Sequence, residues 1–265
     1  MSIHDFQYII FAFENYKSVL HCLHGMLQNT FLHIPGIGRK TESELWKKGI
    51  LNWEELRDAG TRFVLDAEQS IEAFRKENYG FFRLPDSQNW RAYKELKDKC
   101  CFVDIETTGL CRYTDDITLI GLHDSRGTKI FMNGEDLEEF QKEISKYEMV
   151  VTFNGKSFDI PFISQKFRDF KCPAFHVDLR WVLRELGYSG GLKSIETQLG
   201  MQREEEIKGL SGYDAVRLWY RYKRGDDQSL ELLKTYLHAD VENLRNIMDF
   251  SYQRMKEKNF YPFID

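Results

Sequence analysis

The chain has 265 residues, of which 42% are hydrophobic and 30% are charged, and its formal net charge is −5. This length suits one large domain with a smaller appendage, and 20 phenylalanines and 13 tyrosines can fill a sizeable core, which excludes long-range disorder. The acidic balance excludes a general nucleic-acid coat protein, which would be basic. It leaves room for a site that concentrates carboxylates and neutralises them with divalent ions.

The five cysteines are odd in number and form no CxxC pair, which indicates neither a disulfide framework nor a zinc site. A reducing compartment fits this usage, so we expect a cytoplasmic protein. No apolar run approaches the roughly 20 residues of a bilayer span, so we expect no membrane association. Residues 1–25 lack the features of a signal peptide. We expect them to be an N-terminal extension whose deletion leaves folding and activity intact.

Residues 26–85 predict a small helical region. Its first part reads as helix, tight turn and helix, with the turn at Ile34–Gly38. Thr41 is followed three residues later by Glu44, which predicts a capping box at the start of the second helix. Residues 61–85 look helical and end at Leu84-Pro85, a predicted linker.

The segment Phe31–Lys40 resembles a helix-hairpin-helix motif. Such a hairpin turns backbone N–H groups at a helix start toward a phosphate, and Gly36 and Gly38 would permit close approach. Arg39 and Lys40 would add positive charge, so the resemblance implies sequence-independent binding of nucleic acid. The alternative is a helical packing module that touches no nucleic acid, since the hairpin is single.

Residues 95–256 predict an α/β domain. Strands are expected at 101–106, 117–122, 129–132 and 149–153. Helices are expected at 135–147, 158–170, 178–186, 192–199, 213–223 and 229–256. Three early strands, followed by a strand between helices, indicate a mixed β-sheet flanked by helices.

Asp104 and Glu106 are two residues apart on the first predicted strand, so their side chains leave the same face. Two carboxylates on one face of a buried strand repel each other and lose their hydration unless a cation compensates. Mg²⁺ and Mn²⁺ prefer such oxygen ligands. Taken alone, the pair is more simply explained as two carboxylates at an exposed strand end, hydrogen-bonded to the following turn.

Two later segments carry further acids. Asp159 opens a predicted helix just after Asn154-Gly155, although a helix N-terminus favours a carboxylate in any case. Tyr236 and Asp240 are four apart on a helix and share a face, so both can point into one cleft. The alternative is a half-buried tyrosine beside a solvated aspartate.

Taken together and in this order, these segments resemble the DEDD exonuclease superfamily of the ribonuclease-H-like fold. The resemblance covers about 95–255 and rests on DIETTGL at 104–110, FNGKSFDIPF at 153–162 and YLHAD at 236–240. The second motif looks like that of the proofreading domain of family-B DNA polymerases. The YprB-type ribonuclease-H-like family is a closer match, because its pattern also includes His176-x-Asp178-Leu179, Gly191–Glu196 and Leu218-Trp219. The tyrosine in the last motif implies the DEDDy subtype.

The resemblance implies hydrolysis of phosphodiester bonds with two divalent ions, Mg²⁺ or Mn²⁺. Asp104 would bridge both ions, Glu106 and Asp240 would complete one site, and Asp159 would orient the other, largely through water. Tyr236 would position the attacking water, because a phenol with a pKa near 10 is a poor base. The substrate would be a single-stranded 3′ end of DNA or RNA, and the products 5′-nucleotides.

By the same resemblance, further residues would contact the substrate: Thr107, Thr108, Leu110, Asn154 and Phe158. Lys193 precedes a helix and could meet a phosphate, or it could simply be solvated. His176 has no role in a scheme of four acids and Tyr236, which favours a structural hydrogen bond over a catalytic base. The basic and aromatic segment Arg217–Arg224 could stack single-stranded bases, but its helical spacing favours an amphipathic helix with buried aromatics.

Two other functions compete with the 3′→5′ exonuclease. A structure-selective endonuclease or ribonuclease of the same fold would use the same metal pair. A non-catalytic nucleic-acid-binding module should have lost at least one acid, whereas all four are present together with Tyr236. No feature of the sequence points to a protein partner.

Overall fold

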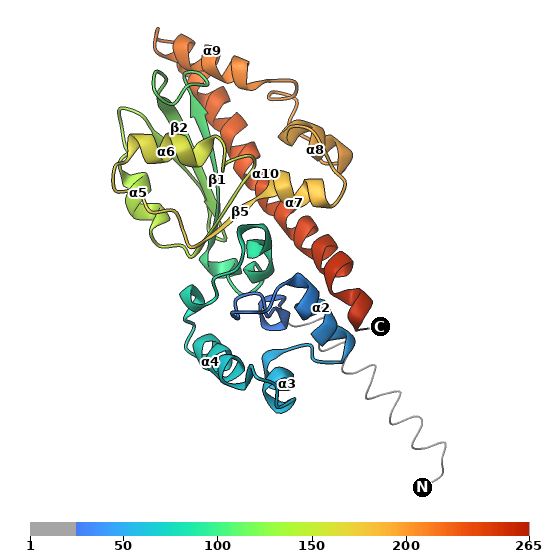
Figure 1. Ribbon diagram of the computed structural model, residues 1–265. Helices are drawn as coiled ribbons and strands as arrows, with labels where there is room; N and C mark the ends of the chain where they lie inside the picture. Colours follow the sequence, from blue (N-terminus) through green and yellow to red (C-terminus); the bar gives the residue numbers. More distant parts are fainter. Residues whose placement is uncertain (1–24, 265) are drawn as a thin grey trace. The chain divides into compact units, whose positions relative to one another are not determined.

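The structure is a computed structural model that describes residues 25–264. The predicted extension, residues 1–25, falls outside these residues except for Gly25. The described chain forms two compact units: a small unit of residues 25–95 and 254–264, and a large unit of residues 96–253. Helix α10 (Asp227–Asn259) runs through the large unit and gives its last residues to the small one (Figure 1).

The regular elements in the described part of the small unit are helices, joined by turns and loops. Its elements are η1 (Leu27–Asn29), α2 (Arg39–Lys47), α3 (Trp53–Asp58), α4 (Val64–Arg75), η2 (Tyr79–Phe81), η3 (Asp86–Ala92), the end of α10 and η5 (Tyr261–Phe263). Aromatic side chains hold it together: Trp53 stacks on Phe82 with ring centroids 4.9 Å apart. Trp46 contacts Phe260 edge-on at 5.2 Å, which ties α2 to the residues after α10.

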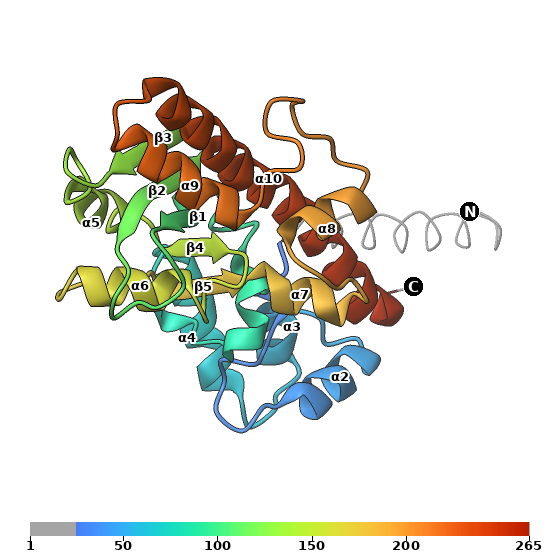
Figure 2. The ribbon, with the colours of Figure 1, turned by 90° about the horizontal axis from the view of Figure 1, so that it is seen from above.

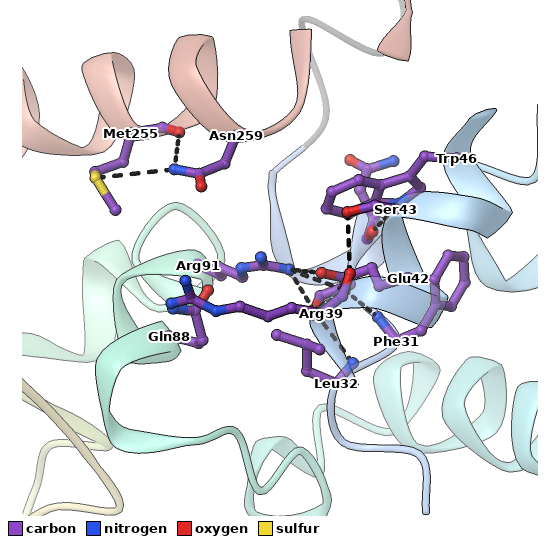
Figure 3. A network of polar contacts seen from close by, with 12 residues as sticks. Phe31, Leu32, Arg39, Glu42, Ser43, Trp46, Gln88, Arg91, Met255 and Asn259 are labelled. Atoms are coloured by element: carbon purple, nitrogen blue, oxygen red, sulfur yellow. Dashed lines mark hydrogen bonds and ion pairs between the residues drawn. The ribbon is translucent and has the colours of Figure 1, made fainter. Parts of the chain in front are cut away.

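A buried carboxylate organises the turn of the small unit. Glu42 on α2 accepts hydrogen bonds from the Thr30 hydroxyl and the Phe31 N–H, each at 2.8 Å, and pairs with Arg91 at 2.8 Å (Figure 3). The predicted capping box is wrong. Helix α2 begins at Arg39, two residues before the predicted cap, and its N-cap residue Gly38 has no side chain to bond the first turn.

The large unit contains a five-stranded mixed sheet. Its strands are β1 (Cys100–Thr107), β2 (Ile117–Asp124), β3 (Gly127–Met132), β4 (Met149–Thr152) and β5 (Phe175–Asp178), in the order β3-β2-β1-β4-β5. The first three strands pair antiparallel, whereas β4 and β5 run parallel to β1. The expected α/β fold with a mixed sheet is therefore confirmed. Strand β5 was not predicted, because its alternation of apolar and polar residues extends over only four positions and it pairs with a strand distant in sequence.

Helices cover both faces of this sheet. The helices of the large unit are α5 (Glu139–Ile144), α6 (Asp159–Lys166), α7 (Leu179–Glu185), α8 (Leu192–Gln198), α9 (Gly212–Tyr222) and α10. One core joins the sheet to α5 and α6, and a second core joins the other face to α9 and α10 (Figure 2). Among residues 25–264, no helix is both long and apolar enough to cross a membrane.

The alternation along β1 decides where its acids point. Cys101, Val103 and Ile105 belong to the core beneath α5 and α6. Because successive side chains of a strand leave opposite faces, Asp104 and Glu106 face the side of α9 and α10.

A glycine lets α10 approach the sheet beside these acids. Gly121 on β2 lies opposite Asp104 in the strand register. A Cβ atom at this position would lie 2.9 Å from Cγ1 of Val241 and 3.0 Å from Cγ of Leu237, closer than packed carbon atoms tolerate. The missing side chain therefore allows α10 to bring its polar residues against the strand that carries Asp104.

Candidate active site

Acidic side chains from three elements converge in the large unit. Asp104 and Glu106 on β1 and Asp240 on α10 each offer a carboxylate oxygen, and these three atoms lie within 4.8 Å of one another. Asp159, the first residue of α6, lines the same cavity of about 520 Å³. Its side chain is 2% exposed, and its Oδ1 has no hydrogen-bond partner among the described residues.

Burial raises the pKa of all four carboxyl groups. The pKa of Asp159 rises to about 7, with the charge of Asp178 adding to the effect of burial. For Asp104 and Glu106 the pKa rises well above the ordinary range, because neighbouring acids add their negative charge to the effect of burial. These groups therefore resist full ionisation unless cations join them.

One arginine compensates part of this charge. Arg203 forms an ion pair with Asp240 and a two-pronged pair with Glu196 at 2.6 and 2.7 Å. Asn243 on α10 donates to the same Glu196 at 2.9 Å. Burial raises the pKa of Asp240 to about 6, and Arg203 opposes that rise. Arg203 was not predicted as a site residue, because a single arginine before a run of glutamates carries no signal of its own.

The donors present suit divalent metal ions. Carboxylate oxygens are the hard ligands that Mg²⁺ and Mn²⁺ prefer, and three of them come within one coordination sphere. The partnerless Oδ1 of Asp159 is a further donor in the same cavity. A divalent ion would also relieve the repulsion that raises the pKa values of Asp104 and Glu106.

Tyr236 lies one helical turn before Asp240 on α10 and lines the cavity. Burial raises its pKa, and the nearby acids raise it further, so the side chain is a neutral phenol. The ammonium of Lys193 stands 4.6 Å from the centre of its ring. Burial lowers the pKa of Lys193, while Asp240 and Glu106 act in the opposite direction. Lys193 therefore sits within the field of the acids.

The loop before Asp159 is held by a residue of the unpredicted strand β5. Asp178 accepts hydrogen bonds from the N–H groups of Asn154 and Lys156, at 2.8 and 3.1 Å. It fixes Asn154 in a left-handed conformation, with φ of 63°. His176 on the same strand bonds the Thr152 hydroxyl at 2.9 Å, the structural role that the sequence favoured. These contacts set where α6 begins and thus where Asp159 lies.

The structure brings the expected substrate contacts to the cavity wall. The lining residues among them are Thr107, Thr108, Leu110, Asn154 and Phe158. The side chain of Leu110 is open to solvent, since this residue is 86% exposed. The Thr107 hydroxyl instead donates a hydrogen bond to the carbonyl of Gly109 in the following turn, at 2.6 Å. Tyr213, which was not predicted as a site residue, also lines the cavity and is 73% exposed. It precedes the segment Arg217–Arg224, where Leu218 and Trp219 are buried as an amphipathic helix requires.

The glycine turn of the small unit is exposed. Gly36 has φ of 85°, a conformation that a side chain disfavours, and Gly38 precedes the first residue of α2. Arg39 and Lys40 open the helix and are also exposed. The helix-hairpin-helix assignment stays a prediction.

The chain is similar in fold to parts of several solved structures. The family B DNA polymerase of Pyrobaculum calidifontis is similar over 60% of this chain, at 18% identity and TM-score 0.44, and the chain spans about a quarter of the polymerase, 24%. Brucella melitensis NrnC bound to pGG is similar over 65% of this chain and 80% of its own, at 17% identity and TM-score 0.45. The Aedes aegypti Nibbler EXO domain is similar over 67% and 92%, at 8% identity and TM-score 0.43.

No curated protein sequence matches the chain. Residues 101–252, however, match the ribonuclease H superfamily, and this segment contains β1, the loop before α6 and most of α10. It includes each of the four acids and covers more than half of the sequence. The chain belongs to the ribonuclease H superfamily.

Proposed function

We propose that the chain is a metal-dependent 3′→5′ exonuclease of the DEDDy type that releases 5′-nucleotides by a two-metal mechanism. The observation that carries this proposal is the convergence of Asp104, Glu106 and Asp240, with Asp159, in one cavity. A fold does not keep four carboxylates together, three of them buried, for stability, because their desolvation and mutual repulsion oppose folding. Their retention favours a catalytic role over a binding module.

Each residue then has a chemical task. Asp104, Glu106 and Asp240 would hold divalent ions, with Asp159 as a further oxygen donor. Bound there, such ions lower the pKa of water and stabilise the charge that develops on the phosphate. Tyr236, kept neutral by burial, can orient a water molecule by hydrogen bonding but cannot act as its base. Arg203 keeps the Asp240 carboxylate directed into the site.

The 3′→5′ polarity rests on the resemblance of the three motifs to the DEDD exonucleases. An unpaired end suits the cavity wall, because the side chains of Leu110, Phe158 and Tyr213 offer apolar and aromatic surface to a base. Membership of the YprB-type subfamily and a cytoplasmic location stay predictions from the sequence.

The test uses 3′- and 5′-labelled single-stranded and duplex DNA and RNA, incubated with Mg²⁺ or Mn²⁺. We expect shortening from the 3′ end that EDTA abolishes, and Asp104→Asn should lose it. A wild-type protein that cleaves none of these substrates would contradict the proposed nuclease activity. Internal cuts in a 3′-blocked substrate would instead identify the endonuclease that the same residues can serve.

We also propose that the turn around Gly36 and Gly38 contacts a phosphate backbone without sequence preference. The exposure of this turn, together with that of Arg39 and Lys40, supports the proposal. Replacing both cations with alanine should weaken the mobility shift of duplex DNA. The control replaces Lys47 and Lys48, exposed at the other end of α2. Equal mobility shifts for both double variants would mean that the turn packs the helices together and does not contact nucleic acid.

A further inference from the structure

A second cavity adjoins the one that holds the acids. It has a volume of about 550 Å³, within the range of roughly 300–1,000 Å³ that is usual for ligand sites. We call it the arginine pocket, because Arg180 and Arg184 of α7 line it, together with Tyr188 and Gly190. Phe153 and Asn154 belong to both cavities, so a ligand that leaves the acids past Asn154 enters the arginine pocket.

The arginines of this pocket are available to an anion. Arg180 and Arg184 are both exposed, and neither forms an ion pair with a carboxylate of the described chain. Arg180 donates to the neutral amide oxygen of Asn154 at 2.6 Å. The guanidinium of Arg184 stands 5.7 Å from the centre of the Trp181 ring, one turn earlier on α7. In an acidic chain, two cations without carboxylate partners beside an acidic cleft suit a phosphate backbone.

We propose that the arginine pocket binds the nucleotide upstream of the scissile bond, with its 5′ phosphate on Arg184 and Arg180. The proposal rests on the proposed function, since it takes the acids as the point of cleavage. The terminal nucleotide then occupies the cavity with the acids, and the strand passes Asn154 into the arginine pocket. Phosphate contacts of this kind fix the register of a strand without reading its sequence.

Substrates of different length distinguish binding in the arginine pocket from binding at the site of cleavage. A dinucleotide with a 5′-hydroxyl has a single phosphodiester, which the acids would occupy, so no phosphate is left for Arg184. A hexanucleotide has further phosphates that reach the arginine pocket. Arg184 contacts none of the acids in the structure, so its replacement tests the pocket without disturbing the site of cleavage.

Binding is measured first, without metal and therefore without cleavage. Fluorescein-labelled single-stranded DNA and RNA hexanucleotides are titrated with the full chain in EDTA, over a range of KCl. Arg184→Ala should weaken binding about three- to tenfold, as for one lost charge-assisted contact. The slope of log K against log salt should become shallower by about 0.7, the value for one phosphate of a single strand.

Arg224→Ala is the matched control. Arg224 is an exposed arginine two residues beyond α9, whose first residues line the cavity with the acids. Val216 is the last residue of that helix to line the cavity, and about two helical turns, a rise of about 12 Å, separate it from Arg224. It should bind like the wild type, and Arg184→Lys should recover part of the lost affinity. Equal affinities and salt slopes for Arg184→Ala and Arg224→Ala would overturn the proposal.

Kinetics with Mg²⁺ then test the placement of the pocket. Arg184→Ala should raise KM for the hexanucleotide with kcat unchanged, and it should leave both constants for the dinucleotide as in the wild type. An equal loss on both substrates would place Arg184 at the site of cleavage and contradict the proposal. If the wild type cleaves nothing although Arg184→Ala still weakens binding, the exonuclease fails and the arginine pocket stands as a nucleic-acid site.

Discussion

Arg203 forms the buried ion pairs that compensate the charge of two acids in this site. Its side chain is 8% exposed, and those of its partners Asp240 and Glu196 are 6% and 3% exposed. Removing one partner of a buried ion pair typically costs about 3–5 kcal/mol, because a charge is left buried without compensation. We therefore expect Arg203→Met to lower the free energy of unfolding by about that amount in EDTA.

The same variant should lose less stability in Mg²⁺, since an ion at Asp240 replaces part of the missing positive charge. Urea unfolding with and without Mg²⁺ measures the difference. Arg217→Met is the control, because Arg217 is exposed and pairs with Asp214 at 3.8 Å. A loss for Arg203→Met that is no larger than for Arg217→Met would show that the buried pairs contribute no net stability.

His33 gives the small unit a pH dependence. Ser70 donates to the carbonyl of Asp66 at 2.7 Å, so its oxygen accepts from Nε2–H of His33 at 2.8 Å. Nδ1 of His33 is then buried without a partner among the described residues. The ring centroids of Trp53 and Phe82 lie 5.6 and 5.0 Å from the centroid of the His33 ring. Burial lowers the pKa of His33 from 6.5 to about 4.

This shift fixes the direction of the effect. Below pH 6.5 the unfolded chain takes up a proton at His33 that the folded chain refuses until about pH 4. Stability should therefore fall as the pH falls through this window, by up to about 3 kcal/mol for this residue. Tryptophan fluorescence in urea follows it, because Trp46, Trp53 and Trp90 lie in the small unit. His33→Gln should flatten the dependence, and His238→Gln, at an exposed site on α10, should not.

At the scale of single residues, the sequence predicted the four acids but not the residues that position them. The four acids could be found because each stands in a motif, and the motifs occur in a fixed order. Asp178 and Arg203 act on the acids through folding alone: one accepts backbone hydrogen bonds 24 residues away, and the other pairs with Asp240 from 37 residues away. Arg203 is a lone charged residue in a polar segment and gives no sign of such a contact, and the family pattern that includes Asp178 does not say what its side chain contacts.

Among the elements, α10 determines whether the site is complete. It carries Tyr236 and Asp240, and its approach to β1 depends on the absent side chain of Gly121. Gly121→Ala should shift α10 or force Val241 and Leu237 from their positions, because these residues are fully buried. Overpacking of this kind costs about 1–3 kcal/mol, so the free energy of unfolding should fall by that amount.

A double mutant tests the cause. Val241→Ala removes the atom that a methyl group at position 121 would meet at 2.9 Å. The double variant Gly121→Ala/Val241→Ala should therefore be more stable than the sum of the single changes predicts, by at least about 0.5 kcal/mol. Additive losses in urea unfolding would mean that β2 and α10 do not press on each other here.

The elements themselves were partly predictable. Long segments with clear periodicity, such as α10 and the strands β1 and β2, follow from the sequence. The strand β5 and the true start of α2 do not, because parallel pairing with β4 and the burial of Glu42 are decided by tertiary contacts. Both elements hold functional or buried polar groups. At these positions tertiary contacts with a charged group, rather than local propensity, determine the backbone structure.

At the scale of the whole molecule, the acids and the glycine turn lie in different compact units, joined through α10 and the chain around Glu95. The net charge of −5 describes the whole chain and does not show that the acids and the glycine turn lie in different units. Most carboxylates at the surface are solvated, whereas Glu106, Asp159 and Asp240 of the large unit are buried and Asp104 is partly buried beside them. A divalent ion should therefore stabilise the molecule through the large unit alone.

Hydrogen exchange measured by mass spectrometry can locate this effect. Mg²⁺ at about 100 times its dissociation constant should raise the free energy of unfolding by about 2.7 kcal/mol through mass action. Slower exchange is expected in β1 and in α10 around Asp240, because the ion would connect these two elements. Helices α2, α3 and α4 carry none of the acids and should exchange at unchanged rates. Asp104→Asn should abolish the protection, whereas equal protection of α3 and β1 would mean that Mg²⁺ acts on the molecule by some route other than the four acids.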